Sequence, residues 1–396
     1  MSPTMLNQMV GLTTTVQIWK KLNTCYTSHS RARVKKLKLQ LKTPKRERDV
    51  PTYLLDIKKS VNALSANGSS IIDEVIILIY VDDILITRNN ATHIKSLIST
   101  LHSQFALKDL GLLNFFLGIE AHWSPIGALH LSQTKYTQQI LDKAKMLDAK
   151  PQPSPMISSL KLIVDASTAF SDPTLYRQIV GALQYLTFTR PDITFSVNKV
   201  CQFMHNPQLH HWQAVKRILR YIAGTQFHGI RFSPSSSKSL QAFTDADWGF
   251  DPDDRKSTSG YCVYFGNNIV SWSSKKQKVV SRSSTEAEYR SLASAMTDIS
   301  WIQSLLHELH VVVPTPIIHC DNLGAVLLTA NPIMHSRTKH FELDLHFILD
   351  KVKHKQVFVR HIPARFQIAD AFTKPISGSA FHDFRQKLTV VTVYPP

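Results

Sequence analysis

Paired cysteines are missing from this 396-residue sequence, and so are long apolar runs. Its four cysteines, Cys25, Cys201, Cys262 and Cys320, stand far apart with no C-x-x-C pair. This excludes a zinc knuckle or a disulfide framework and predicts a reduced, intracellular chain. No secretory pattern opens the sequence. The apolar run at 75–81 is far shorter than the roughly 20 residues that span a bilayer. We expect a protein that is neither secreted nor membrane-embedded and acts in the cytoplasm or the nucleus.

Acidic residues are scarce as well. The chain has 29 Asp and Glu against 46 Lys and Arg, a formal charge of +17. Such a balance predicts a polyanionic partner, nucleic acid before membrane. The excess is concentrated in residues 1–73, which hold 13 Lys and Arg against 4 Asp and Glu. The dense run "RARVKKLKLQLKTPKRER" there could equally be the solvated face of a helix.

The spacing of apolar residues changes along the chain and predicts several domains. Residues 1–65 have helical spacing, and two β-rich runs, "VIILIY" and "ILIT", flank Asp82 and Asp83 as a hairpin would. Residues 173–221 are helical again. After a Ser-rich linker, strands and helices alternate in an order typical of an α/β layer with a mixed sheet. Single strands are expected at 240–247, 315–320 and 356–361, and a pair of strands at about 259–274. Helices are expected at 284–310, 323–330 and 338–353, with a last short helix after residue 361.

Four acidic positions in this last region could share one site. Asp245 lies near the end of the first strand, Asp321 follows the strand "PIIHC", and Asp370 enters the final helix in "FQIADAFTKP". In "SSTEAEYRSLA", Glu286 and Glu288 compete for the fourth position. Residues two apart on a helix differ by about 200° around its axis, so only one can face the sheet. The apolar stripe that begins at Leu292 extends back to Glu288, and we expect Glu286 on the solvent side.

A cluster of four carboxylates predicts a metal site. The carboxylates would repel one another unless divalent cations lay between them. Oxygen ligands favour Mg²⁺, or Mn²⁺, over zinc. Two such ions about 4 Å apart are typical of enzymes that hydrolyse phosphodiesters.

The motifs in this region carry a resemblance. "TDADWG", "DPDDRKSTSGYCVYFG", "SSTEAEY", "IHCDN", "HSRTKH" and "IADAFTKP" resemble, in that order, the ribonuclease H domain of copia-type LTR retrotransposon Gag–Pol polyproteins. The resemblance implies a five-stranded mixed sheet with flanking helices. It also implies that Asp245, Glu288, Asp321 and Asp370 bind metal and catalyse endonucleolytic cleavage of RNA in RNA–DNA hybrids.

Three weaker features have two interpretations each. His361 could assist proton transfer or product release, or be an ordinary histidine at a strand end. Arg337, Lys339 and His340 in "HSRTKH" could contact hybrid phosphates, or form a solvated basic loop. The sequence "HELH" at 307–310 lacks the H-E-x-x-H spacing and predicts no zinc site.

The Asp pair has a counterpart in the same family. "YVDD" resembles the catalytic motif of reverse transcriptases, and "FALKDLG", "FFLGIE" and "WQAVKRILRYIAGT" continue the copia-type polymerase. Asp82 and Asp83 would then be two of three metal-binding aspartates, the third lying on an earlier strand. Instead, "GLTTTVQIWKKL" and "YLLDIKKSVNAL" resemble the Gag region, an assembly module through which the chain could self-associate. We expect the polymerase motif to be incomplete and polymerase activity to be lost.

These observations predict a multidomain α and α/β chain with five parts. They are a truncated Gag-like helical segment (1–72), a C-terminal part of reverse transcriptase (73–155), a connection-like helical region (156–238), the ribonuclease H domain (239–380) and a tail (381–396). The predicted function is Mg²⁺-dependent cleavage of hybrids. The alternatives are a non-catalytic nucleic-acid-binding or assembly remnant, a pseudogene product that does not fold, and a polymerase completed by another chain.

Overall fold

The structure is a computed structural model that describes residues 76–80, 83–87, 90–104, 107–157, 162–164, 168–330 and 341–392. The Gag-like segment predicted for residues 1–72 lies outside the described residues. So do Asp82 and the basic residues Arg337, Lys339 and His340. The predictions made for those residues therefore stay predictions.

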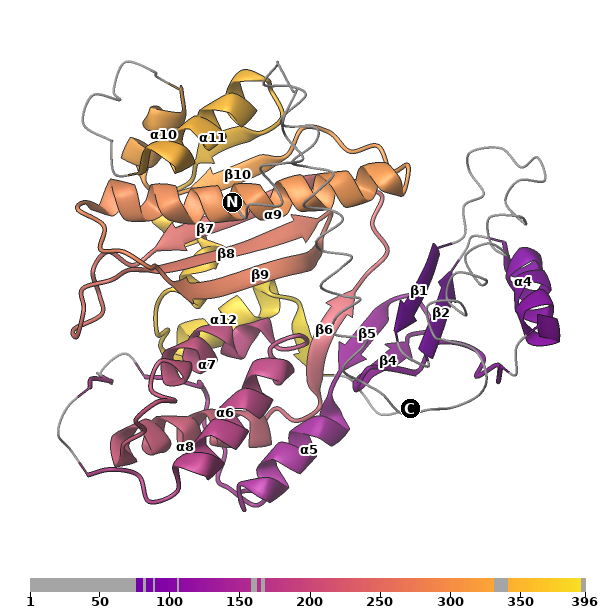
Figure 1. The fold of residues 1–396 in the computed structure, drawn as a ribbon, viewed down its shortest axis with the longest axis horizontal. Coiled ribbons are helices and arrows are strands. Elements are labelled where there is room, and N and C mark those ends of the chain that lie inside the picture. Colours follow the sequence, from indigo (N-terminus) through magenta and orange to yellow (C-terminus); the bar gives the residue numbers. More distant parts are fainter. Residues whose placement is uncertain are drawn as a thin grey trace, which may run out of the picture. The chain divides into compact units, whose positions relative to one another are not determined.

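The chain divides into two compact units, one containing residues 1–76 and 86–109 and the other 77–85 and 110–396. In the first, helix α4 (Ala91–Gln104) begins after Asn90, whose Oδ1 accepts hydrogen bonds from the backbone N–H groups of the first turn. Strands β1 (Ile76–Tyr80) and β2 (Asp83–Thr87) pair in a two-stranded sheet (Figure 1). Both expected strands are thus confirmed, but the second begins at Asp83 itself and not after the Asp pair.

A mixed five-stranded sheet forms the centre of the second unit, as predicted. Its strand order is β11-β10-β7-β8-β9. The first three strands in sequence pair antiparallel, whereas β10 runs parallel to both β7 and β11. As a result, β7 and β10 end at the same edge of the sheet, which is where Asp245 and Asp321 lie. The strands are β7 (Leu240–Ala246), β8 (Thr258–Phe265), β9 (Asn268–Lys276), β10 (Ile317–Cys320) and β11 (Phe358–His361).

Helix α9 (Ser284–Glu308) covers one face of this sheet, with α10 (Leu323–Ala330) and α11 (Glu342–Lys353) packed beside it (Figure 1). The helix begins after Ser283, whose Oγ accepts a hydrogen bond from the backbone N–H of Glu286 at 3.1 Å. Its buried stripe packs on the apolar residues of β7, β8 and β10. The stripe consists of Tyr289, Leu292, Met296, Ile299 and Ile302.

The opposite face of the sheet packs on the segment that follows β11. This segment contains the short helices η4 (Ala364–Phe366) and η5 (Ile368–Phe372), helix α12 (Gly378–Lys387) and strand β12 (Val390–Thr392). One buried cluster joins both parts. It contains Cys262, Tyr264 and Ile269 from the sheet with Phe372, Leu388 and Val390 from the segment.

A second sheet has five antiparallel strands in the order β12-β6-β5-β4-β3. Three of them lie between α4 and residue 133 in the sequence. The other two, β6 (His228–Phe232) and β12, occupy stretches expected to be helical connection and tail. Ile230 is paired with Val390. The remaining strands are β3 (Phe115–Phe116), β4 (Ile119–Trp123) and β5 (Leu129–Ser132).

A large apolar core is formed mainly by the helices of residues 134–223. Helix α12 contributes Phe381 to this core. Asp172 begins one of these helices by accepting a hydrogen bond from the backbone N–H of Leu175 at 2.8 Å. Within the described residues, no helix is long and apolar enough to cross a membrane. The helices are α5 (Thr134–Lys143), α6 (Pro173–Leu186), η1 (Pro191–Ile193), α7 (Thr194–Cys201) and α8 (Leu209–Ala223).

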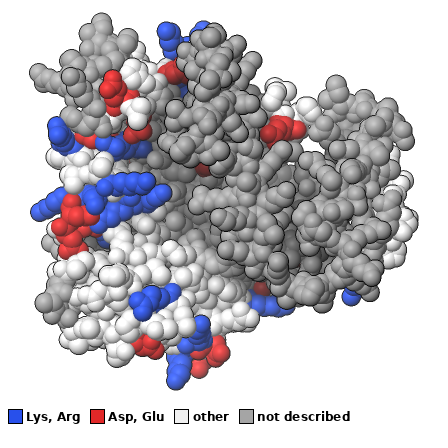
Figure 2. Space-filling model, in the orientation of Figure 1, with Lys and Arg blue, Asp and Glu red and all other residues white. Residues whose placement is uncertain are grey.

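Ion pairs connect this helical region to the mixed sheet. Asp251, in the loop after β7, accepts from Nζ of Lys199 on α7 at 2.9 Å and from Nζ of Lys276 on β9 at 2.8 Å. Lys276 also pairs with Asp254 at 2.9 Å. Figure 2 shows basic and acidic side chains next to one another at the left edge of the face drawn there, with further charged groups at its lower and upper edges. The buried pairs at Asp251 fix the loop that follows the acid-bearing strand.

Candidate active site

Asp245 lies at the centre of the site, near the carboxyl end of β7. Its side chain is 3% exposed. Its carbonyl oxygen accepts from Ser291 Oγ of α9 at 2.9 Å. Its carboxylate atom Oδ2 accepts from the hydroxyl of Thr373 and pairs with Lys374 Nζ at 3.4 Å. Contacts from a helix and from the η5 segment therefore fix both the backbone and the side chain of this aspartate.

Glu288, in the first turns of α9, faces Asp245 and Asp321. Burial, together with the negative charges of Asp245 and Asp321, raises the pKa of Glu288 far above its usual range. The structure thus places Glu288 on the sheet side, as expected. The expectation that Glu286 faces solvent is wrong, because Glu286 is 3% exposed and pairs with Arg290 Nη2 at 2.9 Å. Its charge is neutralised within the helix, away from the cluster.

Asp321 directly follows β10, and parallel pairing of β10 with β7 brings it to the same edge as Asp245. Its Oδ1 accepts from Gln367 Nε2 at 3.1 Å. One possible ligand atom each from Glu288, Cys320 and Asp321 lies within 4.8 Å of the others. Burial raises the pKa of the Cys320 thiol, so the neutral thiol predominates beside these two carboxylates.

Asp370, on η5, completes the group of four. Its side chain is 23% exposed, and it pairs with Lys374 Nζ at 2.9 Å. Burial and the charge of Asp245 raise the pKa of Asp370, against the opposing effect of Lys374. η5 reaches the sheet because Gly260 of β8 has no side chain. A Cβ there would lie 2.7 Å from Cβ of Phe372 and 2.6 Å from Cγ2 of Thr373.

The structure brings Asp245, Glu288, Asp321 and Asp370 together from four separate elements. It also places His361 at the border of this group, exposed at the end of β11, with Nε2 3.2 Å from the carbonyl oxygen of Asp321. The role of His361 stays a prediction.

Three neighbouring residues were not predicted as part of the site: Gln367, Thr373 and Lys374. All three fall in the segment "FQIADAFTKP", of which only Asp370 was singled out. The signal available in the sequence was their spacing of three and four residues from Asp370, since such residues share one face of a helical turn.

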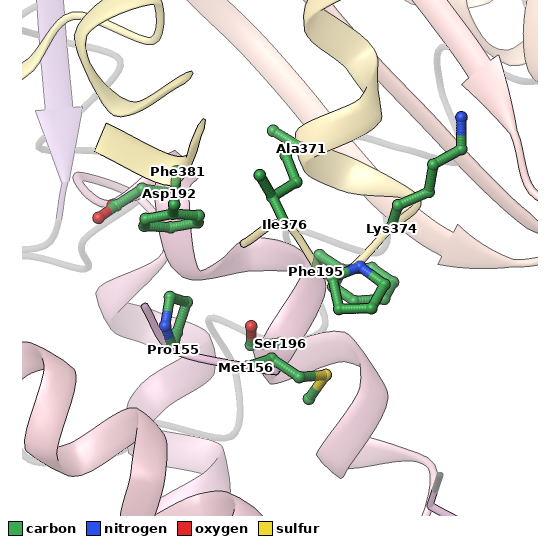
Figure 3. Close-up of a pocket in the computed structure, with 10 residues that line it drawn as sticks. Pro155, Met156, Asp192, Phe195, Ser196, Ala371, Lys374, Ile376 and Phe381 are labelled. Carbon is green, nitrogen blue, oxygen red and sulfur yellow. The ribbon is translucent and has the colours of Figure 1, made fainter. Parts of the chain in front are cut away.

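Lys374 also borders a narrow crevice (Figure 3). Its walls come from Pro155 and Met156, from η1 and α7, and from η5 and the segment after it as far as Phe381 of α12. The space inside is about 10 Å³, which is no more than one water molecule needs. The crevice is therefore a packing seam and offers no room for a ligand. In Figure 3, the nitrogen of Lys374 points away from the other labelled side chains.

The four carboxylates have the chemistry of a site for hard divalent cations. They offer oxygen donors, which suit Mg²⁺ or Mn²⁺, and a single thiol, which does not make a zinc site by itself. Burial and the negative charges of Asp245 and Asp321 raise the pKa of Glu288, and a bound cation would offset those charges. The residues present thus fit the predicted metal ions.

Comparisons with known proteins place these features in a family. The sequence profile "Reverse transcriptase (RNA-dependent DNA polymerase)" matches residues 58–158. The Arabidopsis thaliana "Retrovirus-related Pol polyprotein from transposon RE2" is 48% identical over 352 residues, which cover 88% of this chain and 24% of that protein. A transposon Ty5-1 protein of Saccharomyces cerevisiae is 31% identical over 57% of this chain and 74% of its own length.

A solved structure of LC11-RNase H1 shares 17% identity, with a TM-score of 0.28, and the similarity covers 34% of this chain and 93% of that one. The chain spans about a quarter of the length of the plant Pol polyprotein that it matches. The level of identity and its extent along the chain show that this protein belongs to the Pol polyproteins of copia-type retrotransposons.

Proposed function

We propose that this protein cleaves the RNA strand of RNA–DNA hybrids endonucleolytically, with Mg²⁺ or Mn²⁺ as cofactor. The observation that supports the proposal is the convergence of Asp245, Glu288, Asp321 and Asp370 at one edge of the mixed sheet. Bound divalent ions would supply a water of lowered pKa and neutralise the charge that develops on the phosphate.

The chain's own residues contribute position and charge. Asp245 is fixed by Ser291 and Thr373, so its carboxylate is already oriented and loses little freedom on binding a cation. Glu288 holds a proton more tightly than an ordinary glutamate, because it is buried and because its neighbours Asp245 and Asp321 are carboxylates. Charge neutralisation at the site should therefore release that proton from the Glu288 carboxyl oxygen.

The proposed substrate follows from charge and from the family. A formal charge of +17 favours a polyanion. Arg337, Lys339 and His340 are the residues proposed to contact the phosphates, and His361 lies at the border of the acid group. Assembly through residues 1–72, and action in the cytoplasm or the nucleus, remain predictions.

Polymerase activity is not part of the proposal. Asp83 begins β2 at an exposed position, in a two-stranded sheet. Phosphoryl transfer depends on positioned metal ligands, and the motif supplies two of the three aspartates expected. The 396 residues tested alone are therefore expected not to extend a primer.

The test is cleavage of a labelled RNA–DNA hybrid by the full chain in Mg²⁺. Asp245→Asn should reduce the rate by at least about a thousandfold, because it removes the charge at the centre of the site. Asp350→Asn is the matched control, since Asp350 is exposed on α11 and pairs with His354. Hybrid binding without cleavage by folded wild-type protein would instead support a non-catalytic, nucleic-acid-binding remnant.

A further inference from the structure

The ammonium group of Lys374 lies between two of the four acids. Its Nζ is 2.9 Å from Oδ1 of Asp370 and 3.4 Å from Oδ2 of Asp245. The same Oδ2 accepts the hydroxyl of Thr373. Thr373 and Lys374, which are adjacent in the sequence, thus place a hydroxyl donor and a positive charge beside carboxylates that are proposed as metal ligands.

The acids divide into two halves by their contacts. Asp245 and Asp370 are paired with Lys374, whereas Glu288 and Asp321 lie together beside Cys320, with ligand atoms within 4.8 Å. Asp321 instead accepts from the neutral amide of Gln367. Lys374 therefore places a positive charge against Asp245 and Asp370, whereas Glu288 and Asp321 have a neutral thiol, a neutral amide and the Asp245 carboxylate beside them.

We propose that Lys374 and a divalent cation compete for Asp245 and Asp370, so that divalent ions bind this site in two unequal classes. The inference rests on the proposed function, since it assumes that these acids hold metal. The stronger class involves Glu288 and Asp321. Asp245 and Asp370 would hold the weaker class, and they would be free to do so only after the ammonium of Lys374 has moved away.

The ammonium of Lys374 and a divalent ion cannot bind Asp370 and Asp245 at the same time, for reasons of distance and charge. A divalent ion bound directly to carboxylate oxygens lies about 2.0–2.2 Å from them, in the space that the ammonium fills at 2.9 Å. Two cations so close would repel strongly, since the site is only partly exposed to solvent. Lys374 has room to leave, because 45% of its side chain is exposed and its stem is flexible.

In the metal-free protein, Lys374 should stabilise the negative charge of Asp245. This carboxylate is 3% exposed, and a buried charge without a partner is costly. Lys374 provides the compensating charge until a divalent ion replaces it. Its removal should therefore weaken the metal-free protein and strengthen metal binding at the same time.

The experiment measures Mn²⁺ binding by electron paramagnetic resonance and calorimetry on wild type, Lys374→Met and Lys256→Met. Lys256 is the matched control, since it pairs with Asp254 at 3.0 Å, outside the acid group. In Lys374→Met the weaker class should tighten by at least about tenfold. Lys256→Met should bind as wild type does. Asp370→Asn should remove the weaker class and keep the stronger one.

Thermal melting gives a second measurement. Lys374→Met should melt below wild type without metal, and saturating Mn²⁺ should raise its melting temperature by more than it raises that of wild type. Equal affinities in wild type and Lys374→Met would overturn the inference, even if hybrids are cleaved. Loss of cleavage in Lys374→Met with unchanged affinities would also overturn it and make Lys374 a substrate contact. No Mn²⁺ binding by either protein would reject both the inference and the proposed function.

Discussion

Gln367 and Asp321 are joined by a hydrogen bond of 3.1 Å, from the side-chain Nε2 of Gln367 to Oδ1 of Asp321. The same Nε2 donates to the carbonyl oxygen of Thr244 at 2.8 Å, next to Asp245 in the sequence. A single buried amide therefore sets the position of one acid relative to the strand that bears another.

Gln367→Leu should lower the rate of hybrid cleavage by about 10–100-fold, because Asp321 loses the donor that orients it. The free energy of unfolding should fall by about 1–3 kcal/mol, since buried polar groups lose their partner. Cleavage kinetics and urea denaturation measure the two effects. Gln241→Leu, at the opposite end of β7, is the control. A cleavage rate equal to that of wild type would show that Asp321 needs no such support.

Gly260→Ala should displace η5 from the sheet, since the new Cβ would lie 2.6 Å from Thr373 and 2.7 Å from Phe372. Asp370 would move away from Asp245, and cleavage should fall by at least about tenfold. Gly181→Ala is the matched control. Gly181 lies inside α6 with no atom within 4 Å of a new Cβ, so the exchange should stabilise the protein by about 0.5–1 kcal/mol.

Asp192→Asn should destabilise the protein by about 3–5 kcal/mol. Arg190 and Asp192 form a buried pair through two hydrogen bonds, of 2.9 and 2.8 Å, and Tyr221 donates to the same carboxylate at 2.6 Å. Removing one partner leaves the Arg190 charge buried without its counter-ion. Chemical denaturation measures the loss. Asp142→Asn, on the exposed side of α5, should change stability by less than about 0.5 kcal/mol.

Stability should depend on pH through Asp251. Burial opposes its charge, but hydrogen bonds from Lys276 and Lys199 prevail and lower the pKa of Asp251 to about 2 from the ordinary 3.8. A carboxyl whose pKa is lower in the folded state stabilises the protein above the unfolded pKa, and this effect is lost as pH falls towards the folded value. The difference in melting temperature between wild type and Asp251→Asn should be constant above about pH 5 and shrink between pH 4 and 2. A difference that grows as the pH falls would contradict the assigned ion pairs.

Much of the mixed sheet could be predicted from sequence because its strands and helices have local signals. The apolar stripe of α9 that begins at Leu292 extends back to Glu288, and it correctly placed Glu288 towards the sheet. The same reasoning failed for Glu286. Helical periodicity considers only apolar residues, and it does not predict that Arg290, one turn later, neutralises the carboxylate and allows it to be buried.

The β6 and β12 strands of the second sheet could not be predicted, because their pairing is long-range. Ile230 and Val390 are paired although 160 positions separate them, and neither strand alternates over enough residues to stand out. The environment of the acids was hidden for a similar reason. The spacing of Gln367 and Lys374 from Asp370 indicates a shared helical turn, but it gives no sign that they contact β7 and the residue after β10.

The pairing of β12 with β6 has a consequence for how the chain is made. A ribosome completes β6 at residue 232 but does not supply its partner until residue 392 has been translated. During that interval the outer edge of β6 is open to solvent and to other nascent chains. Phe381, which packs in the helical core, is also translated late. Synthesis that stops shortly before these residues would therefore weaken two regions at once, and a molecular chaperone would have most to protect in that window.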